Sequence, residues 1–359
     1  MGRFFVLLFV GLIAALPVTL AAGSSEHFGS QSVQPVTLVS AASTIWSFAQ
    51  DDEMLAWETT QGTRSTIQVR TASGRRPVTV SRPDGGDGPY VMEEFALGGR
   101  RVVWGGFVDC CNNGYGELET AAPGSKAKEL RPLSLDEWAW GDYPTGAAGD
   151  GTTLVYSLAT IYPLDETERE WRVTDGGVWR VTATKSVRVP GTPPTALLAA
   201  TRGTIALVPA DRRRSQKDSI QVTAATNARV EIRDAATGAV RASFVPKGRV
   251  AALGMDAEIA AVIVQSGKEA RVEWYSAQSG RLLGASSVPR SVSDVVDVST
   301  RTIVLRRDKT ILAIDTGTGR IRDLAHASST PVGLSIEGDR VAWAEKVGNR
   351  GAIRAVTVR

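Results

Sequence analysis

The feature that most constrains the fold is an internal repeat that runs through almost the whole chain of 359 residues. Seven segments share one pattern: a strand of small or apolar residues, a turn rich in Gly or Asp, and a second apolar strand. They read TIWSFAQDDEMLAWE, EEFALGGRRVVWG, TGAAGDGTTLVYS, ALLAATRGTIALVP, VAALGMDAEIAAVIV, VVDVSTRTIVLRR and VGLSIEGDRVAWA. Repeats of this kind bury their apolar faces against neighbouring copies of the same unit.

The second strand of each segment carries one aligned position, and successive positions are about 38 to 54 residues apart. This period is typical of the blades of a β-propeller. The aligned residues are Trp57, Trp104, Tyr156, Leu207, Ala261, Leu305 and Trp343. The spacing therefore predicts seven blade-sized units.

Each unit continues with a third strand, a tight turn and a fourth strand. Apolar and polar residues alternate in the third strand, as at Val230 and Ile232, which is typical of a half-buried strand. Most of the turns end in a glycine, which can adopt the positive φ that a tight hairpin needs. These turns are Ser73-Gly74, Pro123-Gly124, Thr237-Gly238, Ser279-Gly280 and Thr318-Gly319. The pattern predicts an all-β protein, a seven-bladed β-propeller of four-stranded antiparallel blades.

The two ends of the repeat complement each other. The seventh unit has only three strands before the chain ends, whereas QPVTLVS at 34–40 is a strand that precedes the first unit. We predict that 34–40 pairs with 351–359 and completes the last blade, which removes an exposed sheet edge. The alternative is a disordered tail beside an incomplete blade. If 34–40 pairs with 351–359 as predicted, residues 34–359 form one propeller domain.

Two motifs carry a resemblance to known propellers. GDRVAWAEKVGNRGAIRAV at 338–356 resembles the strand-turn-strand unit of TolB-type and WD-repeat-like propellers. IRDAATGAV and AIDTGTGRI resemble the Asp-x-x-Thr-Gly turn of quinoprotein-like and YVTN-type repeats. The chain lacks the Gly-His and Trp-Asp pairs of true WD repeats, the aspartate box of sialidase-like propellers and the tryptophan that closes each quinoprotein repeat. The resemblance therefore implies a fold and carries over no catalytic residue.

The first residues have the layout of a secretory signal peptide. Arg3 precedes an apolar run from Phe4 to Leu20, and small residues follow. We expect a signal peptide at 1–22, cleaved between Ala21 and Ser24, and a flexible segment at 23–33. The rival interpretation is an uncleaved membrane anchor, for which the apolar run is short and contains a proline. The prediction is an exported protein, in the periplasm, in the cell envelope or secreted, with no membrane span after cleavage.

The inventory of charged and metal-binding residues excludes several classes of function. A formal net charge of +3 gives no electrostatic argument for nucleic-acid binding. Only His27 and His326 are present, so a histidine-rich zinc site is excluded and a Ser-His-Asp triad would depend on His326. PDGGDG at 83–88 lacks the full spacing of a calcium loop and is interpreted as a turn. We expect no metal and no cofactor.

Long insertions cluster in the first four units. In a propeller, the connections between second and third strands and between successive blades lie on one face, here called the decorated face, and long loops on a rigid scaffold often carry function. The insertions are SRPDGGDGPY, GFVDCCNNGYGE, RPLSLDEWAWGDYP, ATIYPLDETEREWRVTDGG and PADRRRSQKDSIQVTAATNA. We predict that a partner binds to this face above blades 2–4.

Aromatic residues are frequent in these insertions and could stack on a ligand, while neighbouring polar groups hydrogen-bond its rim. The candidate binding residues are Tyr90, Asp109, Asn112, Tyr115, Trp138, Trp140, Tyr143, Tyr162 and Trp171. In the alternative interpretation the aromatic residues cap the blades or plug the central channel. The remaining tryptophans fall in blade strands and are expected to pack in the core: Trp46, Trp57, Trp104, Trp179, Trp274 and Trp343.

Cys110 and Cys111 are the only cysteines, and they are adjacent. Neighbouring Cα atoms lie about 3.8 Å apart, closer than ordinary disulfides prefer, so a bond between them would be a strained ring in a tight turn. The following Asn-Asn-Gly favours such a turn. Two free thiols and pairing with another chain are the alternatives. We predict the intrachain bond in an oxidising compartment.

The residues support three hypotheses about function. The first is a monomeric, non-catalytic propeller that binds a protein, peptide or carbohydrate partner at the decorated face. The second is a glycosidase or lyase that uses carboxylates of the same insertions, since paired acids suffice for that chemistry. The third is a TolB-like adaptor in an envelope complex.

Overall fold

The computed structural model describes residues 34–71, 76–83, 90–108, 115–134, 141–163, 170–183, 185–211, 213–215 and 222–358. Within these ranges the chain forms seven antiparallel sheets and no helix, which confirms the predicted all-β class and the seven blades. The described part of the chain accordingly holds no helix that could cross a membrane. The predicted signal peptide and the segment 23–33 lie outside the described residues.

The blades follow one another in chain order, each with its first strand innermost. Blade 1 consists of β2 (Ile45–Asp51), β3 (Met54–Gln61), β4 (Arg64–Arg70) and β5 (Val78–Ser81). Blade 2 consists of β6 (Tyr90–Gly98), β7 (Arg101–Val108), β8 (Tyr115–Ala121) and β9 (Lys128–Ser134). Blade 3 consists of β10 (Gly141–Asp150), β11 (Thr153–Pro163), β12 (Glu170–Val181) and β13 (Ser186–Arg188).

The second half of the ring is built in the same way. Blade 4 consists of β14 (Thr195–Thr201), β15 (Thr204–Pro209), β17 (Val230–Asp234) and β18 (Val240–Phe244). Blade 5 consists of β19 (Arg249–Met255), β20 (Ile259–Ser266), β21 (Glu269–Ser276) and β22 (Leu282–Val288). Blade 6 consists of β23 (Val292–Ser299), β24 (Thr302–Arg307), β25 (Thr310–Asp315) and β26 (Ile321–His326). Blade 7 consists of β27 (Val332–Glu337), β28 (Arg340–Val347) and β29 (Arg350–Thr357), with β1 (Val36–Ala41) as its outermost strand.

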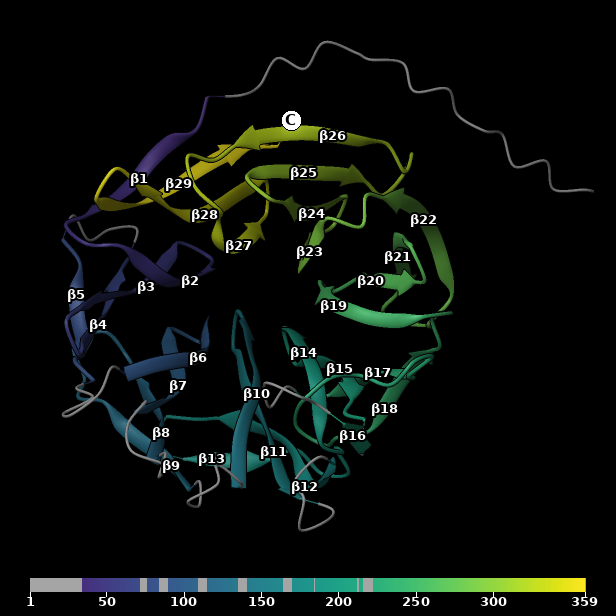
Figure 1. The fold of residues 1–359 in the computed structure, drawn as a ribbon, viewed down its shortest axis with the longest axis horizontal. Helices are drawn as coiled ribbons and strands as arrows, with labels where there is room; N and C mark the ends of the chain where they lie inside the picture. Colours follow the sequence, from purple (N-terminus) through teal and green to yellow (C-terminus); the bar gives the residue numbers. More distant parts are fainter. Residues whose placement is uncertain are drawn as a thin grey trace, which may run out of the picture. The chain divides into compact units, whose positions relative to one another are not determined.

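The inner strands contact one another in turn around the ring, including β27 with β2 (Figure 1). The seventh sheet contains both ends of the described chain, because β1 pairs with β29 in the antiparallel order β1-β29-β28-β27. In this register Val36 lies opposite Ala355 and Ala41 lies opposite Gly351. The pairing gives the last blade the four strands that the other blades have.

The core lies between adjacent blades. The seven residues aligned in the sequence occupy the second strands of the seven blades, and all of them are at most 1% exposed. The indole nitrogens of three of them are satisfied as well, since Trp57 donates to Gln68, Trp104 to Glu119 and Trp343 to Glu345. Buried polar atoms of this kind need such partners. The aligned positions of the sequence repeat are thus the residues that are buried between the blades.

The Asp-x-x-Thr-Gly turns form the same structure twice. Asp234 Oδ1 accepts hydrogen bonds from the Thr237 amide (2.8 Å) and hydroxyl (3.0 Å). Asp315 does the same with Thr318, at 2.8 and 2.7 Å. Gly238 has φ +72° and lies so close to the Pro190 carbonyl that a Cβ has no room. The glycine is therefore required both for the turn and for docking onto the preceding blade.

One tryptophan departs from the expectation. The sequence pattern predicts that Trp46 packs in the core, but its side chain is 60% exposed, so that prediction is wrong. The register of β2 and β3 shifts between Ile45 and Ser47, which leaves Trp46 in a β-bulge. A bulge turns a side chain away from the alternation of the strand.

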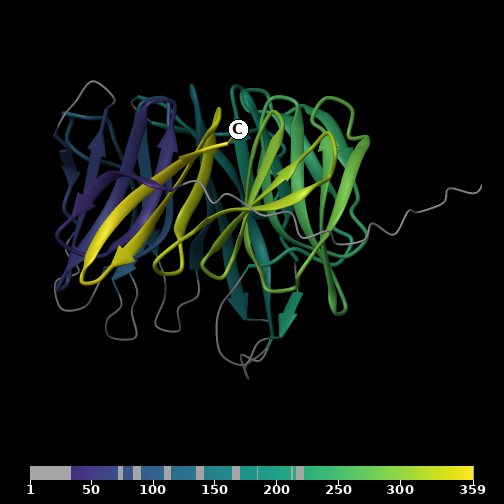
Figure 2. The same ribbon diagram turned by 90° about the horizontal axis from the view of Figure 1, so that it is seen from above.

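Several described residues of the predicted insertions lie in strands. β11 and β12 are the longest strands of the chain, and the short β16 (Arg213–Ser215) pairs with the outer end of β12. Blade 3 therefore has a fifth strand, donated by the connection within blade 4, and it projects beyond the rest of the ring (Figure 2). The extension forms because Ile161 and Val173 bury themselves against Ala210 and Val222.

Candidate functional site

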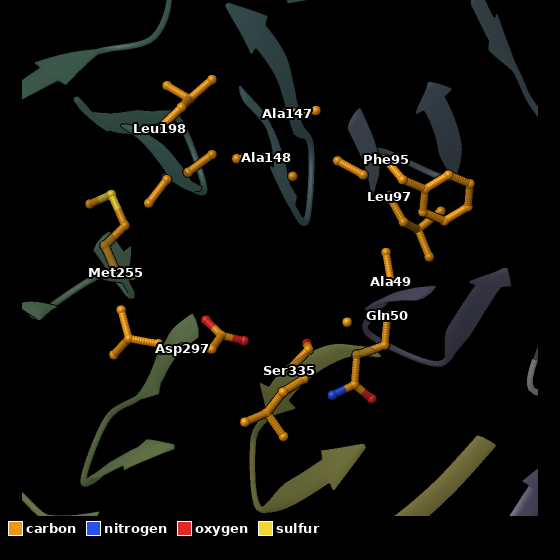
Figure 3. A pocket seen from close by; sticks show the side chains of 18 of the residues that line it. Ala49, Gln50, Phe95, Leu97, Ala147, Ala148, Leu198, Met255, Asp297 and Ser335 are labelled. Atoms are coloured by element: carbon orange, nitrogen blue, oxygen red, sulfur yellow. The ribbon is translucent and has the colours of Figure 1, made fainter. Parts of the chain in front are cut away.

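A central channel runs along the inner strands. Its two mouths and its middle section are lined by different parts of these strands. Its middle section is lined by small and apolar side chains from all seven inner strands (Figure 3). Residues near the starts of the inner strands line a cavity at one mouth. Residues at the ends of the inner strands line the opposite mouth. Because blade-to-blade connections lead into the starts of the inner strands, the first mouth opens on the decorated face.

The middle section carries a single charged side chain among its described residues, Asp297. Its carboxylate accepts hydrogen bonds from the backbone amides of Val298 (2.9 Å) and Ile336 (2.8 Å), and it lies beside Ser335 in Figure 3. Burial raises the pKa of Asp297 to about 7, against the lowering effect of these donors. The backbone bonds give Asp297 a structural role in joining blade 6 to blade 7.

The cavity at the decorated mouth has a volume of about 710 Å³. Blades 2 to 6 supply its described walls, blade 6 through Val292, and the connection within blade 4 covers one side. The lining residues are Glu93, Glu94, Tyr143, Pro144, Thr145, Leu197, Val222, Thr223, Ala224, Arg249, Val250, Ala251, Gln265 and Val292. A cavity of this size and mixed lining is typical of ligand sites, which span about 300–1,000 Å³.

Two adjacent carboxylates face this cavity from the start of β6. Burial raises the pKa of Glu94 to about 8; the backbone amide of Ala147 opposes this shift and the charge of Glu93 adds to it. Burial also raises the pKa of Glu93. Neither carboxylate has a salt-bridge partner among the residues that the structure describes. Carboxylates in this situation favour a ligand that carries positive charge.

Tyr143 links the cavity to the extended hairpin of blade 3. Its ring lies 5.6 Å from that of Phe107 at an interplanar angle of 49°, and it packs against the cluster of Ile161 and Val173. The neighbouring Asp142 accepts hydrogen bonds from Arg131 (2.8 Å) and Thr160 (2.6 Å). These contacts fix the start of β10 and hold the Tyr143 side chain in the wall of the cavity.

The opposite mouth is also acidic, but its carboxylates are arranged differently. Asp51, Asp150 and Glu337 come from blades 1, 3 and 7, and their nearest carboxylate oxygens lie within 4.8 Å of one another. The Gly151 amide donates to Asp51 (2.7 Å), and the Thr201 hydroxyl donates to Asp150 (2.6 Å). Burial raises the pKa of Asp51 to about 6, and neighbouring carboxylates add to the shift.

The structure separates the residues predicted for the site. Tyr143 lines the cavity, and Tyr162 is 46% exposed on the extended hairpin. Tyr90 lies instead between blades 1 and 2, only 7% exposed, with no hydrogen-bond partner for its hydroxyl among the described residues. Tyr115 and Trp171 are strand residues of β8 and β12. The remaining candidates lie outside the described residues: Asp109, Cys110, Cys111, Asn112, Trp138 and Trp140.

The sequence-based prediction missed Glu93 and Glu94. A signal was present, because the first strand of the second repeat carries two adjacent glutamates, whereas at the corresponding positions the sixth repeat has one acid, Asp294, and the other repeats have none. Asp51, Asp150 and Glu337 were missed for a different reason. They are far apart in the chain, and only the packing of three inner strands brings them together.

Comparison with family models and with curated proteins gives no match. Among solved structures, the chain is similar to the β-propeller domain of Myceliophteria thermophila Cps50 (Swd1), with a TM-score of 0.51 and 12% identity over 90% of this chain and 100% of that one. A chain of the Mitotic Checkpoint Complex gives 0.51 and 12% over 96% and 100%. The β-propeller domain of the Trilobed protease from Pyrococcus furiosus, which has an open velcro topology, gives 0.50 and 10% over 90% and 97%. At these identities the similarity establishes the propeller fold and nothing finer.

Proposed function

We propose that the protein is exported and acts as a non-catalytic binding module that holds a protein or peptide partner at its decorated face. The observation that carries this proposal is the cavity of about 710 Å³ at the mouth of the channel, walled by blades 2–6. Its rim is enlarged by the extension of blade 3, to which β16 adds a strand. A rigid ring that presents one enlarged rim and one cavity is suited to recognition.

Asp142, a described acid of the insertions, gives little support to a carbohydrate-active enzyme. Its two carboxylate oxygens accept hydrogen bonds from Arg131 and Thr160. His326 is exposed at the end of β26, with Thr310 at 3.1 Å. A protein partner also agrees with the similarity to a chain of a complex, although that assembly is a property of the other protein.

Filling the cavity tests the proposal. The variant Thr223→Trp places a bulky ring in the cavity, and Ala257→Trp adds the same ring at the exposed rim of the opposite mouth. Each purified protein would be used to capture partners from the exported fraction of the native cells, with quantitative mass spectrometry as the readout. We expect Thr223→Trp to reduce recovery of the partner at least tenfold and Ala257→Trp to retain it. Equal recovery with both variants would contradict the proposal.

A further inference from the structure

We propose that the cavity receives a lysine or arginine side chain of the partner polypeptide, with Glu93 and Glu94 binding its cationic end. This inference deepens the proposed function and rests on it. It concerns the charge of the ligand, which the shape of the cavity alone does not specify.

The charged groups of the lining favour a cation. Glu93 and Glu94 contribute two carboxylates, and Arg249 contributes the single described basic group. Arg249 is already engaged, because it donates a hydrogen bond of 2.6 Å to Gln265. The described surroundings that shift Glu94 are its burial, the Ala147 amide and Glu93, with no cation among them. A positive group would therefore meet carboxylates that lack a counter-charge among the described residues.

The other walls fit the stem of a long basic side chain. Leu197, Val222, Val250 and Val292 supply apolar surface from blades 4, 5 and 6 and from the connection within blade 4. Lysine and arginine bury three or four methylene groups along apolar surface while their charged end contacts polar groups. The combination of an apolar wall and two carboxylates matches this amphipathic shape better than it matches a small ion.

A metal ion fits this cavity less well. Within the described residues, the acidic side chains that approach one another closely enough to share an ion are Asp51, Asp150 and Glu337, at the opposite mouth. That group already accepts hydrogen bonds from Gly151 and Thr201. Glu93 and Glu94 are adjacent in a strand and provide at most four of the six or more oxygen ligands that a calcium ion takes. An organic cation needs fewer contacts of fixed geometry.

Selection from a peptide library tests the charge preference without requiring that the partner be identified first. A library of randomised seven-residue peptides would be selected in parallel on the purified wild-type protein, on Glu93→Gln/Glu94→Gln and on Glu258→Gln. Glu258 is exposed at the opposite mouth, so its variant controls for loss of one acidic group elsewhere. Thermal unfolding would check that all three proteins are folded.

We expect peptides selected by the wild-type and Glu258→Gln proteins to be enriched at least fivefold in Lys or Arg at one position. The Glu93→Gln/Glu94→Gln protein should lose this enrichment, and individual peptides should bind it at least tenfold more weakly. Selection of neutral or acidic peptides by the wild type, no selection, or the same basic motif with both variants would overturn the inference. If partner capture is blocked by Thr223→Trp but retained by Glu93→Gln/Glu94→Gln, the proposed function stands and this inference falls.

Discussion

The two mouths of the central channel are both acidic, but they use their carboxylates in opposite ways. At the opposite mouth, Asp51 and Asp150 accept hydrogen bonds from Gly151 and Thr201, so protein groups occupy them. At the decorated mouth, Glu93 and Glu94 face a cavity of about 710 Å³. Glu94 also accepts a hydrogen bond from the Ala147 amide, so the difference is one of space: the carboxylates of the decorated mouth face a cavity large enough to admit a ligand.

The backbone explains why the opposite mouth is tight. Gly98 in β6 and Gly149 in β10 lie so close that a Cβ on Gly149 would be 3.0 Å from the Gly98 nitrogen and would overlap the Leu97 carbonyl. This close approach brings the end of β10 towards blade 1, where the Gly151 amide reaches Asp51. At the decorated mouth, the residues of β6 and β10 that line the cavity are Glu93, Glu94, Tyr143, Pro144 and Thr145, and none of them is a glycine. The two glycines, Gly98 and Gly149, thus let the inner strands approach closely at the opposite mouth of the channel.

The largest expected effect comes from breaking this close approach. Gly149→Ala adds a Cβ where backbone atoms of β6 already lie, so we expect the free energy of unfolding to fall by about 3 kcal/mol. Gly317→Ala is a matched control, because the nearest atom to its Cβ would be Asp315 Oδ1 at 3.5 Å. Denaturant unfolding of both variants measures the difference. Equal stability of the two would show that the contact between the inner strands is not tight.

The fold could be predicted from the sequence because its determinants are local and repeated. Positions such as Trp57, Trp104 and Trp343 recur at a blade-sized period, and each lies fully buried in the second strand of its blade. The glycine turns were equally predictable, since Gly238 and Gly319 have the positive φ that their motif requires. These features depend on residues within one blade and its neighbour, which a repeat reveals.

The candidate site was less predictable because it depends on register and on distant strands. A bulge at the start of β2 exposes Trp46, and no local pattern marks it. The aromatic criterion selected Tyr143, which lines the cavity, but also Tyr90, which packs between two blades. Residues expected in a loop lie instead in the long strands β11 and β12. The predicted disulfide of Cys110 and Cys111 lies outside the described residues and stays a prediction.

Ligand binding at the decorated mouth should depend on pH. Glu94 has a pKa of about 8, and the groups that share its cavity are Glu93 of β6, Tyr143 of β10 and Arg249 of β19. A cationic peptide should bind the ionised carboxylate, so its affinity should fall as the pH drops below 8, by about 20-fold between pH 8.5 and 6.5.

Calorimetric titration of one selected basic peptide across this range measures the effect. The variant Glu94→Gln should bind weakly at every pH and lose the dependence, whereas Glu258→Gln should keep it. An affinity that is constant from pH 6.5 to 8.5 in the wild type would show that Glu94 does not contact the cation.

The smallest effect concerns stability at the opposite mouth. The pKa of Asp51 is about 6 in the folded protein, above the usual value near 3.8, so the folded state binds this proton more tightly than the unfolded chain. The contribution of Asp51 to stability is therefore present below about pH 4 and is lost as the pH rises through 6. Asp51→Asn keeps an oxygen acceptor for the Gly151 amide and removes the charge. It should raise the free energy of unfolding by about 1 kcal/mol at pH 7.5.

This gain should vanish near pH 4, where the wild-type carboxyl is protonated in the folded state. Denaturant unfolding at pH 7.5, 6 and 4 measures it, with Glu258→Gln as the control for a surface acid. If Asp51→Asn is less stable than the wild type at pH 7.5, the conclusion that protein donors satisfy the carboxylates of the opposite mouth is wrong. It would mean that Asp51, Asp150 and Glu337 share a stabilising cation, so that the opposite mouth would also be completed by a ligand and not by its own donors.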